Sequence, residues 1–396
     1  MNNKKWMAIL LGGIMAASLA APCSVSAAEK TTLTFWHAMG GTNGEVLQQI
    51  VDDFNASQDE IEIKAEYQGT YDDTITKLKA AMQSDSGLPD VCQMYDVGTK
   101  FMYDSGAVIP VEDKFESTGY DKSSVMEVIS SYYTVDGKQY AMPFNVSTPM
   151  LYYNKDVFEA AGLDPETPPT TYDEVLEDAK KIVESGAAPV GYSQAIYGWF
   201  FEQQLAGLGV TYGNNDNGRK EAVTAVDFDS NGGGLKVFDM WKKLYDSGYF
   251  EDYGTTTADT QTAFFSGQVG MIIESTAILK NAVDSSPFEV GTGYLPRIEQ
   301  NDEGGVIIGG GSLWLTDTGN EANEDAAWKF IEYITTPDVQ AKWSMGTGYF
   351  AINEKAYETE DMKAYLKENP NFETAINQLK DSPVNCNTAG VLSGVQ

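Results

Sequence analysis

The side chains that most often carry enzyme chemistry are scarce in this chain of 396 residues. It contains one histidine, His37, and a single imidazole cannot form a histidine-rich zinc site. A serine–histidine nucleophile is also hard to build when only one histidine exists. His37 lies close to Trp36 and Met39, a setting that indicates a hydrogen-bonded residue at a strand end. The sequence therefore predicts no catalytic residue, no metal site and no cofactor.

Cysteine and arginine are almost as rare as histidine. Cys23 falls in the first 30 residues, which leaves Cys92 and Cys386, too few for a disulfide framework or a metal cluster. We expect these two to be buried free thiols. Arg219 and Arg297 are the only arginines, so bidentate recognition of an anion by guanidinium groups is nearly absent. An anionic ligand would have to be bound mostly by other groups.

Acidic residues outnumber basic residues by a wide margin. The chain has 58 Asp and Glu against 26 Lys and Arg, which gives a net charge of −32. Such a surface repels a polyanion, so nucleic acid is disfavoured as a partner. The composition, 42% hydrophobic, is that of a globular protein that buries a core, and the length is sufficient for two domains.

The N-terminus has the pattern of an export signal. Two lysines precede the apolar residues 6–21, and the small residues at 25–27 suit a signal peptidase. The sequence predicts a signal peptide over residues 1–27 and a mature protein in the periplasm or outside the cell envelope. Lipid attachment to Cys23 is the alternative, although Pro22 fits poorly where a small residue is required. No later stretch approaches the ~20 apolar residues of a membrane-spanning helix.

The first part of the mature chain alternates between two hydrophobic periodicities. The patterns predict strands over 33–36, 61–67 and 90–95, and helices over 44–55 and 71–84. This βαβαβ order requires crossover connections, which favour a parallel sheet covered by helices. We therefore expect the chain to open with an α/β domain.

The rest of the chain continues the α/β pattern. Thr171 and Glu174 form a capping-box pattern in front of one predicted helix. Predicted helices cover 156–161, 172–185, 199–208, 234–247, 260–265, 324–335 and 337–345. Predicted strands cover 149–153, 271–273 and 306–308, the last of which continues into three glycines, 309–311. Neither an internal repeat nor a low-complexity linker appears, so we expect strands that cross between two domains.

Residues 147–165 (STPMLYYNKDVFEAAGLDP) and 168–174 (PPTTYDE) closely resemble the extracellular solute-binding proteins of carbohydrate-type ABC importers. The resemblance covers essentially the whole mature chain. Further matching stretches are 34–37, 263–267, 270–271, 307–314 and 346–349. Within this family the chain is most similar to the members that bind sn-glycerol 3-phosphate. The stretches that carry this closer likeness are 35–37, 67–71, 95–99 and 143–149.

The resemblance implies an α/β, two-lobed periplasmic-binding-protein fold of type II, similar to maltose-binding protein, with a hinge and a ligand cleft between the lobes. The first lobe would comprise residues 28–145 and 311–348, and the second lobe 146–310 and 349–396. Crossings between the lobes are expected near 145–147, 309–311 and Tyr349. The family carries an arginine that contacts phosphate after a stretch similar to 387–392. Because the sequence stops at Gln396, we expect it to be truncated before that arginine.

The resemblance also implies a set of ligand contacts. These are Tyr71, Asp96, Ser147, Ser275, Gly310 and Tyr349. A carboxylate can accept hydrogen bonds from two adjacent hydroxyls, hydroxyl groups can donate to phosphate oxygens, and a glycine amide can approach an anion closely. Two alternatives stay open: Asp96 caps the helix that follows it, and Tyr71 serves only in packing.

An aromatic wall is a further expectation at Trp199, whose ring could stack on the carbon skeleton of a ligand. The family motif has a second tryptophan three residues earlier, where this chain has Ile196, so the stacking surface is thinner here. The family has Glu at the position of Asp96, and the shorter side chain reaches one methylene less far.

The function implied by the resemblance is that of a monomeric, non-enzymatic receptor. It would capture sn-glycerol 3-phosphate or a glycerophosphodiester and deliver it to the transmembrane subunits of an ABC permease. A neutral mono- or oligosaccharide is the alternative cargo, consistent with the acidic surface, Ile196 and the scarcity of arginine. A sugar as the cargo is disfavoured by the ligand contacts that this chain shares with the members that bind sn-glycerol 3-phosphate, namely Tyr71, Ser147, Gly310 and Tyr349. A glycoside hydrolase is a more distant alternative, since no pair of carboxylates on converging strand ends is predicted.

Overall fold

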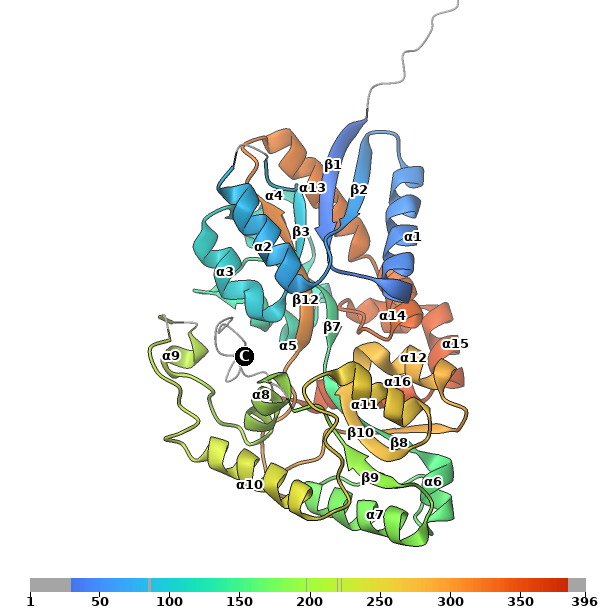
Figure 1. Ribbon diagram of the computed structural model, residues 1–396. Helices are drawn as coiled ribbons and strands as arrows, with labels where there is room; N and C mark the ends of the chain where they lie inside the picture. The colour runs from blue at the N-terminus through green and yellow to red at the C-terminus, as the bar shows by residue number, and fades with distance from the viewer. Residues whose placement is uncertain (1–29, 85–86, 197, 219, 222, 384–396) are drawn as a thin grey trace, which may run out of the picture.

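The computed structural model describes residues 30–383, apart from 85–86, 197, 219 and 222. The expected signal peptide and the residues from 384 onward, including Cys386, lie outside the described residues. Two α/β lobes, each with its own sheet, are stacked one above the other (Figure 1). No helix in this part of the chain is both long and apolar enough to cross a membrane.

The sheet of the first lobe has the strand order β2-β1-β3-β12-β4, and β7 also pairs with β12. Its strands are β1 (Thr31–His37), β2 (Ile61–Tyr67), β3 (Val91–Tyr95), β4 (Val108–Ile109), β7 (Met142–Ser147) and β12 (Gly309–Thr316). β1 is parallel to both β2 and β3, with α1 (Gly41–Ser57) and α2 (Tyr71–Met82) as the connections. The predicted βαβαβ unit is confirmed. β12 returns antiparallel to β3, β4 and β7.

Helices cover this sheet and bury aromatic side chains against it. They include α3 (Thr99–Ser105), α4 (Val111–Thr118), α5 (Glu127–Ser130), α13 (Glu321–Ile334) and α14 (Pro337–Thr347). Phe330 of α13 lies 5.2 Å from Phe54 and 5.5 Å from Phe35, measured between ring centroids. Cys92 is buried in β3 as a free thiol, as expected, and burial raises its pKa to about 12.

The second lobe has a four-stranded sheet in the order β11-β8-β10-β9. Its strands are β8 (Pro149–Asn154), β9 (Val190–Ser193), β10 (Val269–Ser275) and β11 (Val290–Gly293). Helices around this sheet include α6 (Lys155–Ala160), α7 (Tyr172–Ser185), α8 (Gly198–Gly207), α10 (Gly233–Asp246), α11 (Thr257–Phe265), α12 (Leu279–Ser285) and α16 (Asn371–Asp381). The predicted capping box of α7 is present: Thr171 accepts from the Glu174 amide, and Glu174 accepts from the Thr171 amide.

One predicted strand, 306–308, is wrong. The strand begins only at Gly309, so the glycines themselves form the pairing edge of β12. The backbone of Ile307 instead pairs with the side chain of Gln203: its amide donates to Oε1 (3.1 Å), and its carbonyl accepts from Nε2 (2.9 Å). A buried amide side chain thus satisfies the backbone groups that a neighbouring strand would otherwise satisfy.

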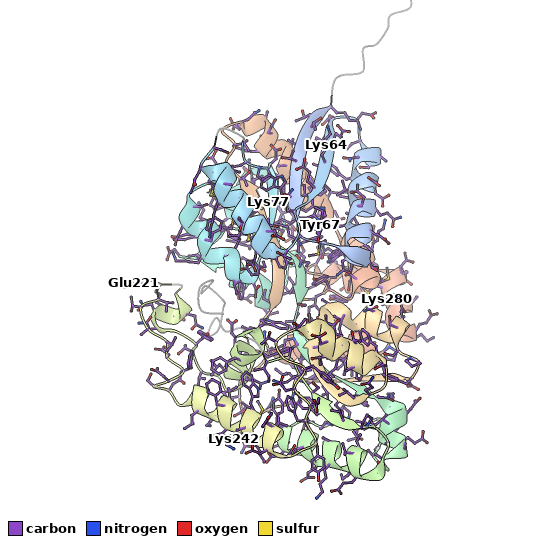
Figure 2. The ribbon with its side chains drawn as sticks, viewed as in Figure 1. Lys64, Tyr67, Lys77, Glu221, Lys242 and Lys280 are labelled. Carbon is purple, nitrogen blue, oxygen red and sulfur yellow. The ribbon has the colours of Figure 1, made fainter. Side chains whose placement is uncertain are left out.

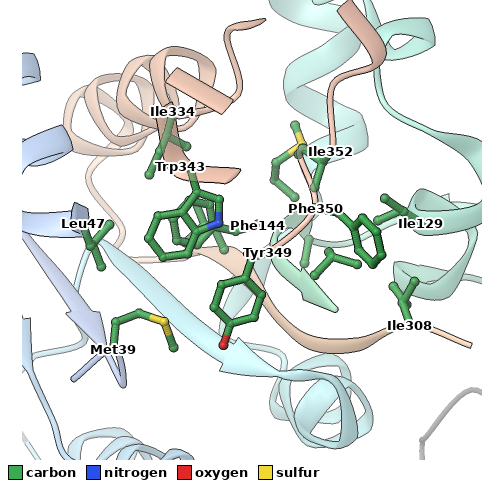
Figure 3. Packing of buried hydrophobic residues seen from close by; sticks show 14 of the residues in the cluster. Met39, Leu47, Ile129, Phe144, Ile308, Ile334, Trp343, Tyr349, Phe350 and Ile352 are labelled. Atoms are coloured by element: carbon green, nitrogen blue, oxygen red, sulfur yellow. The ribbon is translucent and has the colours of Figure 1, made fainter. Parts of the chain in front are cut away.

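Three chain segments cross between the lobes beside one another. β7 continues through Thr148 into β8, while Gly310 of β12 and Phe350 both pair with Val146 of β7. Gly310 has φ +99°, and a Cβ there would lie 1.9 Å from the Asn145 carbonyl oxygen, so only glycine fits. Figure 3 shows Phe350 and Ile308 packed near one another at this junction.

Candidate ligand-binding site

Three of the predicted ligand contacts, Tyr71, Asp96 and Tyr349, lie near Asn145: the two tyrosines are hydrogen-bonded to it, and the charge of Asp96 acts on Tyr71. The Asn145 side-chain amide donates to the Tyr71 hydroxyl at 2.7 Å and accepts from Gln93 Nε2 at 2.7 Å. These residues come from the start of α2, the end of β3, β7 and the segment after α14. Residues far apart in the sequence therefore meet in one polar cluster.

Local capping holds Tyr71 in place. Thr70 is the N-cap of α2 and forms a capping box with Asp73, so Tyr71 begins the helix in a fixed position. Its ring stacks on Tyr95 with a centroid distance of 5.0 Å and an interplanar angle of 9°. Tyr71 therefore does have the packing role that was considered as the alternative. In addition, its hydroxyl belongs to the polar cluster.

Asp96 is a buried acid directly after β3. It opens the short turn Asp96–Gly98, whose N-cap is Tyr95, so Asp96 is not itself the capping residue. Burial raises the pKa of Asp96 to about 7, against the smaller opposing effect of hydrogen bonds from the Val97 amide and its own amide. Near neutral pH this carboxyl group therefore exists in both protonation states.

Tyr349 stands at one end of a stack of aromatic side chains in the first lobe. Its ring stacks on Trp343 (5.5 Å, 8°), which in turn stacks on Phe144 (4.6 Å). Figure 3 shows the hydroxyl of Tyr349 directed away from Trp343. Burial raises the pKa of Tyr349 above its usual value, and a hydrogen bond with Asn145 partly opposes this. Burial likewise raises the pKa of Tyr71, so both phenols stay protonated near neutral pH and can donate hydrogen bonds.

Ser147 and Gly310 belong to the crossing strands β7 and β12, and Trp199 packs against β12. Ser147 ends β7, is buried and lies opposite Gly309 in the strand register. The indole of Trp199 on α8 packs against Gly309 so closely that a Cβ there would lie 2.8 Å from the ring. Trp199 is therefore in contact with the crossing strand, and its side chain is 8% exposed.

Ser275 lies at the end of β10, opposite Pro149, just beyond the first crossing. Its hydroxyl accepts from the Ala277 amide at 3.1 Å and so caps the turn that follows. The Tyr152 hydroxyl donates to the Ser275 carbonyl at 2.7 Å. The structure thus ties Ser275 to its own turn, while the hydrogen of its hydroxyl can still be donated.

Two members of the polar cluster, Gln93 and Asn145, were not among the predicted site residues. Both are fully buried within strands whose other residues are mostly apolar. Gln93 also accepts from the Ala38 amide at 2.8 Å. Because a buried amide needs hydrogen-bond partners, an amide inside an apolar strand was the signal that could have identified them.

The five side chains of this cluster are two amides, two phenols and one carboxyl group, that of Asp96. Lys64 and Lys242, labelled in Figure 2, lie on the surfaces of the first and second lobes and pair there with Glu62 and Asp246. Recognition at the cluster therefore depends on neutral donors and one carboxyl group.

His37 is hydrogen-bonded at the end of β1, as predicted. Its Nδ1 accepts from the Met39 amide at 3.3 Å, and burial lowers its pKa to about 4, which keeps the ring neutral. In the part of the chain that the structure describes, no three His, Cys, Asp or Glu side chains are grouped so that they could hold a metal ion.

Comparison with known proteins gives consistent matches. Residues 49–374 match the family model described as bacterial extracellular solute-binding protein. The sn-glycerol-3-phosphate-binding periplasmic protein UgpB of Brucella abortus (strain 2308) is 33% identical over 389 residues, covering 97% of this chain and 89% of that protein. The corresponding protein of Escherichia coli (strain K12) is 31% identical over 360 residues, covering 89% and 81%.

Two solved structures share the arrangement of the lobes. UgpB from Mycobacterium tuberculosis, in complex with glycerophosphocholine, has a TM-score of 0.78 at 23% identity and covers 89% of this chain and 87% of that one. The cyclic alpha-maltosyl-1,6-maltose binding protein from Arthrobacter globiformis has a TM-score of 0.73 at 26% identity, with coverage of 89% and 87%. Similar folds thus bind both a glycerophosphodiester and a sugar.

Proposed function

The chain belongs to the bacterial extracellular solute-binding protein family, and we propose that its own solute is sn-glycerol 3-phosphate or a glycerophosphodiester. It has the periplasmic-binding-protein fold and is a non-catalytic, extracytoplasmic receptor for a small solute of an ABC importer. The proposed cargo would be passed to the transmembrane subunits of the permease.

The cluster around Asn145 is the observation that carries this proposal. A glycerol group presents adjacent hydroxyls, and the Asp96 carboxylate can accept hydrogen bonds from two of them. The protonated hydroxyls of Tyr71 and Tyr349 can donate to the ligand, while Asn145 fixes their positions. These groups suit a short polyol better than a large apolar ligand.

The phosphate would be bound by neutral donors at the crossing strands. The Ser147 and Ser275 hydroxyls flank the two ends of the first crossing, and Gly310 lies in the second. Hydroxyl and amide groups can bind phosphate oxygens without a basic residue, as they do at other anion sites. The ligand would then contact both lobes near the crossings, and hinge closure would enclose it.

Calorimetric titration of the chain without residues 1–27 tests the proposal. The ligands are sn-glycerol 3-phosphate, glycerophosphocholine and maltose. We expect binding of a phosphate compound, and we expect Asp96→Ala to weaken it on the order of 100-fold, because charge-assisted hydrogen bonds are lost. Asp104→Ala, which removes an exposed carboxylate from α3, is the matched control and should leave affinity unchanged.

A neutral saccharide is the second candidate. The similarity to a sugar-binding protein and the neutral amides and phenols of the Asn145 cluster support it. Binding of maltose, but of neither phosphate compound, with loss of binding in Asp96→Ala, would replace the first proposal with this one.

A further inference from the structure

A cavity of about 500 Å³ lies in the second lobe, and no residue of the Asn145 cluster lines it. Its walls come from the loop before α7, from β11 and the residues after it, from α8 and from α16. None of the seven predicted ligand contacts lines it. The volume is within the range of sites that bind small molecules.

The walls of this cavity carry one positively and one negatively charged side chain. Among the described residues that line it, Arg297 and Asp381 are the only charged ones, and neither forms an ion pair with another described residue. Arg297 uses one N–H to donate to the Asp302 carbonyl at 2.7 Å, which leaves further donors. The remaining polar walls are amides and hydroxyls, such as Gln204 and Thr374. A neutral ligand with many hydroxyl groups fits this set better than an anion or a cation.

An aromatic ring lies beside these polar groups. Tyr294 is 40% exposed, and its hydroxyl donates to Asp381 at 2.8 Å, which anchors the ring while leaving part of it uncovered. Apolar surface with a polar, anchored edge is suited to contact the C–H face of a sugar ring. Pro168 and Pro296 add further rigid apolar surface to the walls.

The cavity is also joined to two of the crossing segments. Gln378 lines it and donates to the Pro149 carbonyl at 2.7 Å and to the Thr148 hydroxyl at 3.3 Å, both at the first crossing. Val306, which leads into the second crossing, donates from its amide to the Ser382 hydroxyl at 3.1 Å. A molecule in the cavity would therefore contact side chains that hold the crossings in place.

We propose that this cavity is a second ligand site, for a neutral mono- or disaccharide, separate from the solute site between the lobes. Tyr294 provides the stacking surface, Arg297 and Asp381 bind hydroxyl groups, and Gln378 connects the site to the first crossing. Such a site allows a sugar to influence lobe movement without occupying the solute site.

Titration with glucose and maltose up to 20 mM tests this proposal in the full chain without its signal peptide. We expect binding that Tyr294→Ala and Arg297→Gln each weaken at least tenfold, and that Asp96→Ala leaves unchanged. Tyr245→Ala removes another exposed tyrosine, on α10 and outside the cavity, and is the matched control. Thermal melts of all variants verify that each is folded.

Hydrogen exchange then locates the bound sugar. We expect added maltose to protect peptides covering 292–306 and 374–382, and to leave those covering 71–96 unchanged. Absence of sugar binding up to 20 mM overturns the proposal. Sugar binding that Asp96→Ala abolishes and Tyr294→Ala leaves intact also overturns it, and assigns the sugar to the solute site instead.

Discussion

The two lobes hold their candidate ligand contacts in different ways. In the first lobe, hydrogen bonds link the side chains to one another, from Gln93 through Asn145 to Tyr71. In the second lobe, Ser275 is hydrogen-bonded within its own turn, and Trp199 packs against the crossing strand. The first-lobe side is thus an interdependent network that is in place before a ligand arrives, whereas each second-lobe contact is held independently. Changes on the first-lobe side should therefore have larger effects.

Gly310→Ala is expected to have the largest effect. A methyl group there would lie 1.9 Å from the Asn145 carbonyl oxygen, and the backbone has φ +99°. Overpacking and the unfavourable dihedral together should lower the free energy of unfolding by about 5 kcal/mol in urea titrations. Gly319→Ala is the matched control, since Gly319 has φ +71° with no atom within 4 Å of the added methyl. Equal losses of unfolding free energy in the two variants would show that the close contact between position 310 and the Asn145 carbonyl has no effect on stability.

Asp96→Asn should alter the pH dependence of stability. The pKa of Asp96 is about 7 in the folded protein and near 3.8 in the unfolded chain, so the folded state retains the proton longer. Its contribution to stability is present below pH 4 and is lost as pH rises to 7. Asparagine does not ionise. Between pH 4 and pH 8 we therefore expect the free energy of unfolding of the variant to rise by up to about 4 kcal/mol relative to that of the native chain.

Urea titrations at pH 4, 5.5, 7 and 8 measure this difference. Asp104→Asn, an exposed carboxylate of the same lobe, should show no such gain. A difference between Asp96→Asn and the native chain that stays constant over this pH range would show that Asp96 does not retain its proton on folding.

Asn145→Ala removes the centre of the network. The Gln93 amide and the Tyr71 hydroxyl would each lose a buried hydrogen-bond partner. Together these losses should lower the free energy of unfolding by about 3 kcal/mol. Affinity for the cognate solute should fall as well, because Tyr71 loses its fixed orientation. A double-mutant cycle with Tyr71→Phe measures the coupling, and additive losses would contradict an interdependent network.

Local sequence patterns anticipated most of the fold, because they reflect nearest-neighbour physics. The capping box of Thr171 and Glu174 and the alternation in β2 act within a few residues, and both are confirmed. The strand predicted at 306–308 is wrong because its backbone partner is the side chain of Gln203, about 100 residues earlier. Asn145 was missed for the same reason: its role depends on Gln93 and Tyr71, which only the folded chain brings near.

Ser275→Ala should have the smallest effect of the series. Loss of the cap on its turn should cost about 1 kcal/mol, and loss of one hydroxyl contact to the solute should weaken binding less than tenfold. Ser275→Thr retains the hydroxyl and should recover most of both losses. Urea titration and calorimetry measure the two quantities separately. If Ser275→Ala weakened binding more than Asn145→Ala did, the second lobe would provide the dominant contacts, and the contrast between the lobes would be reversed.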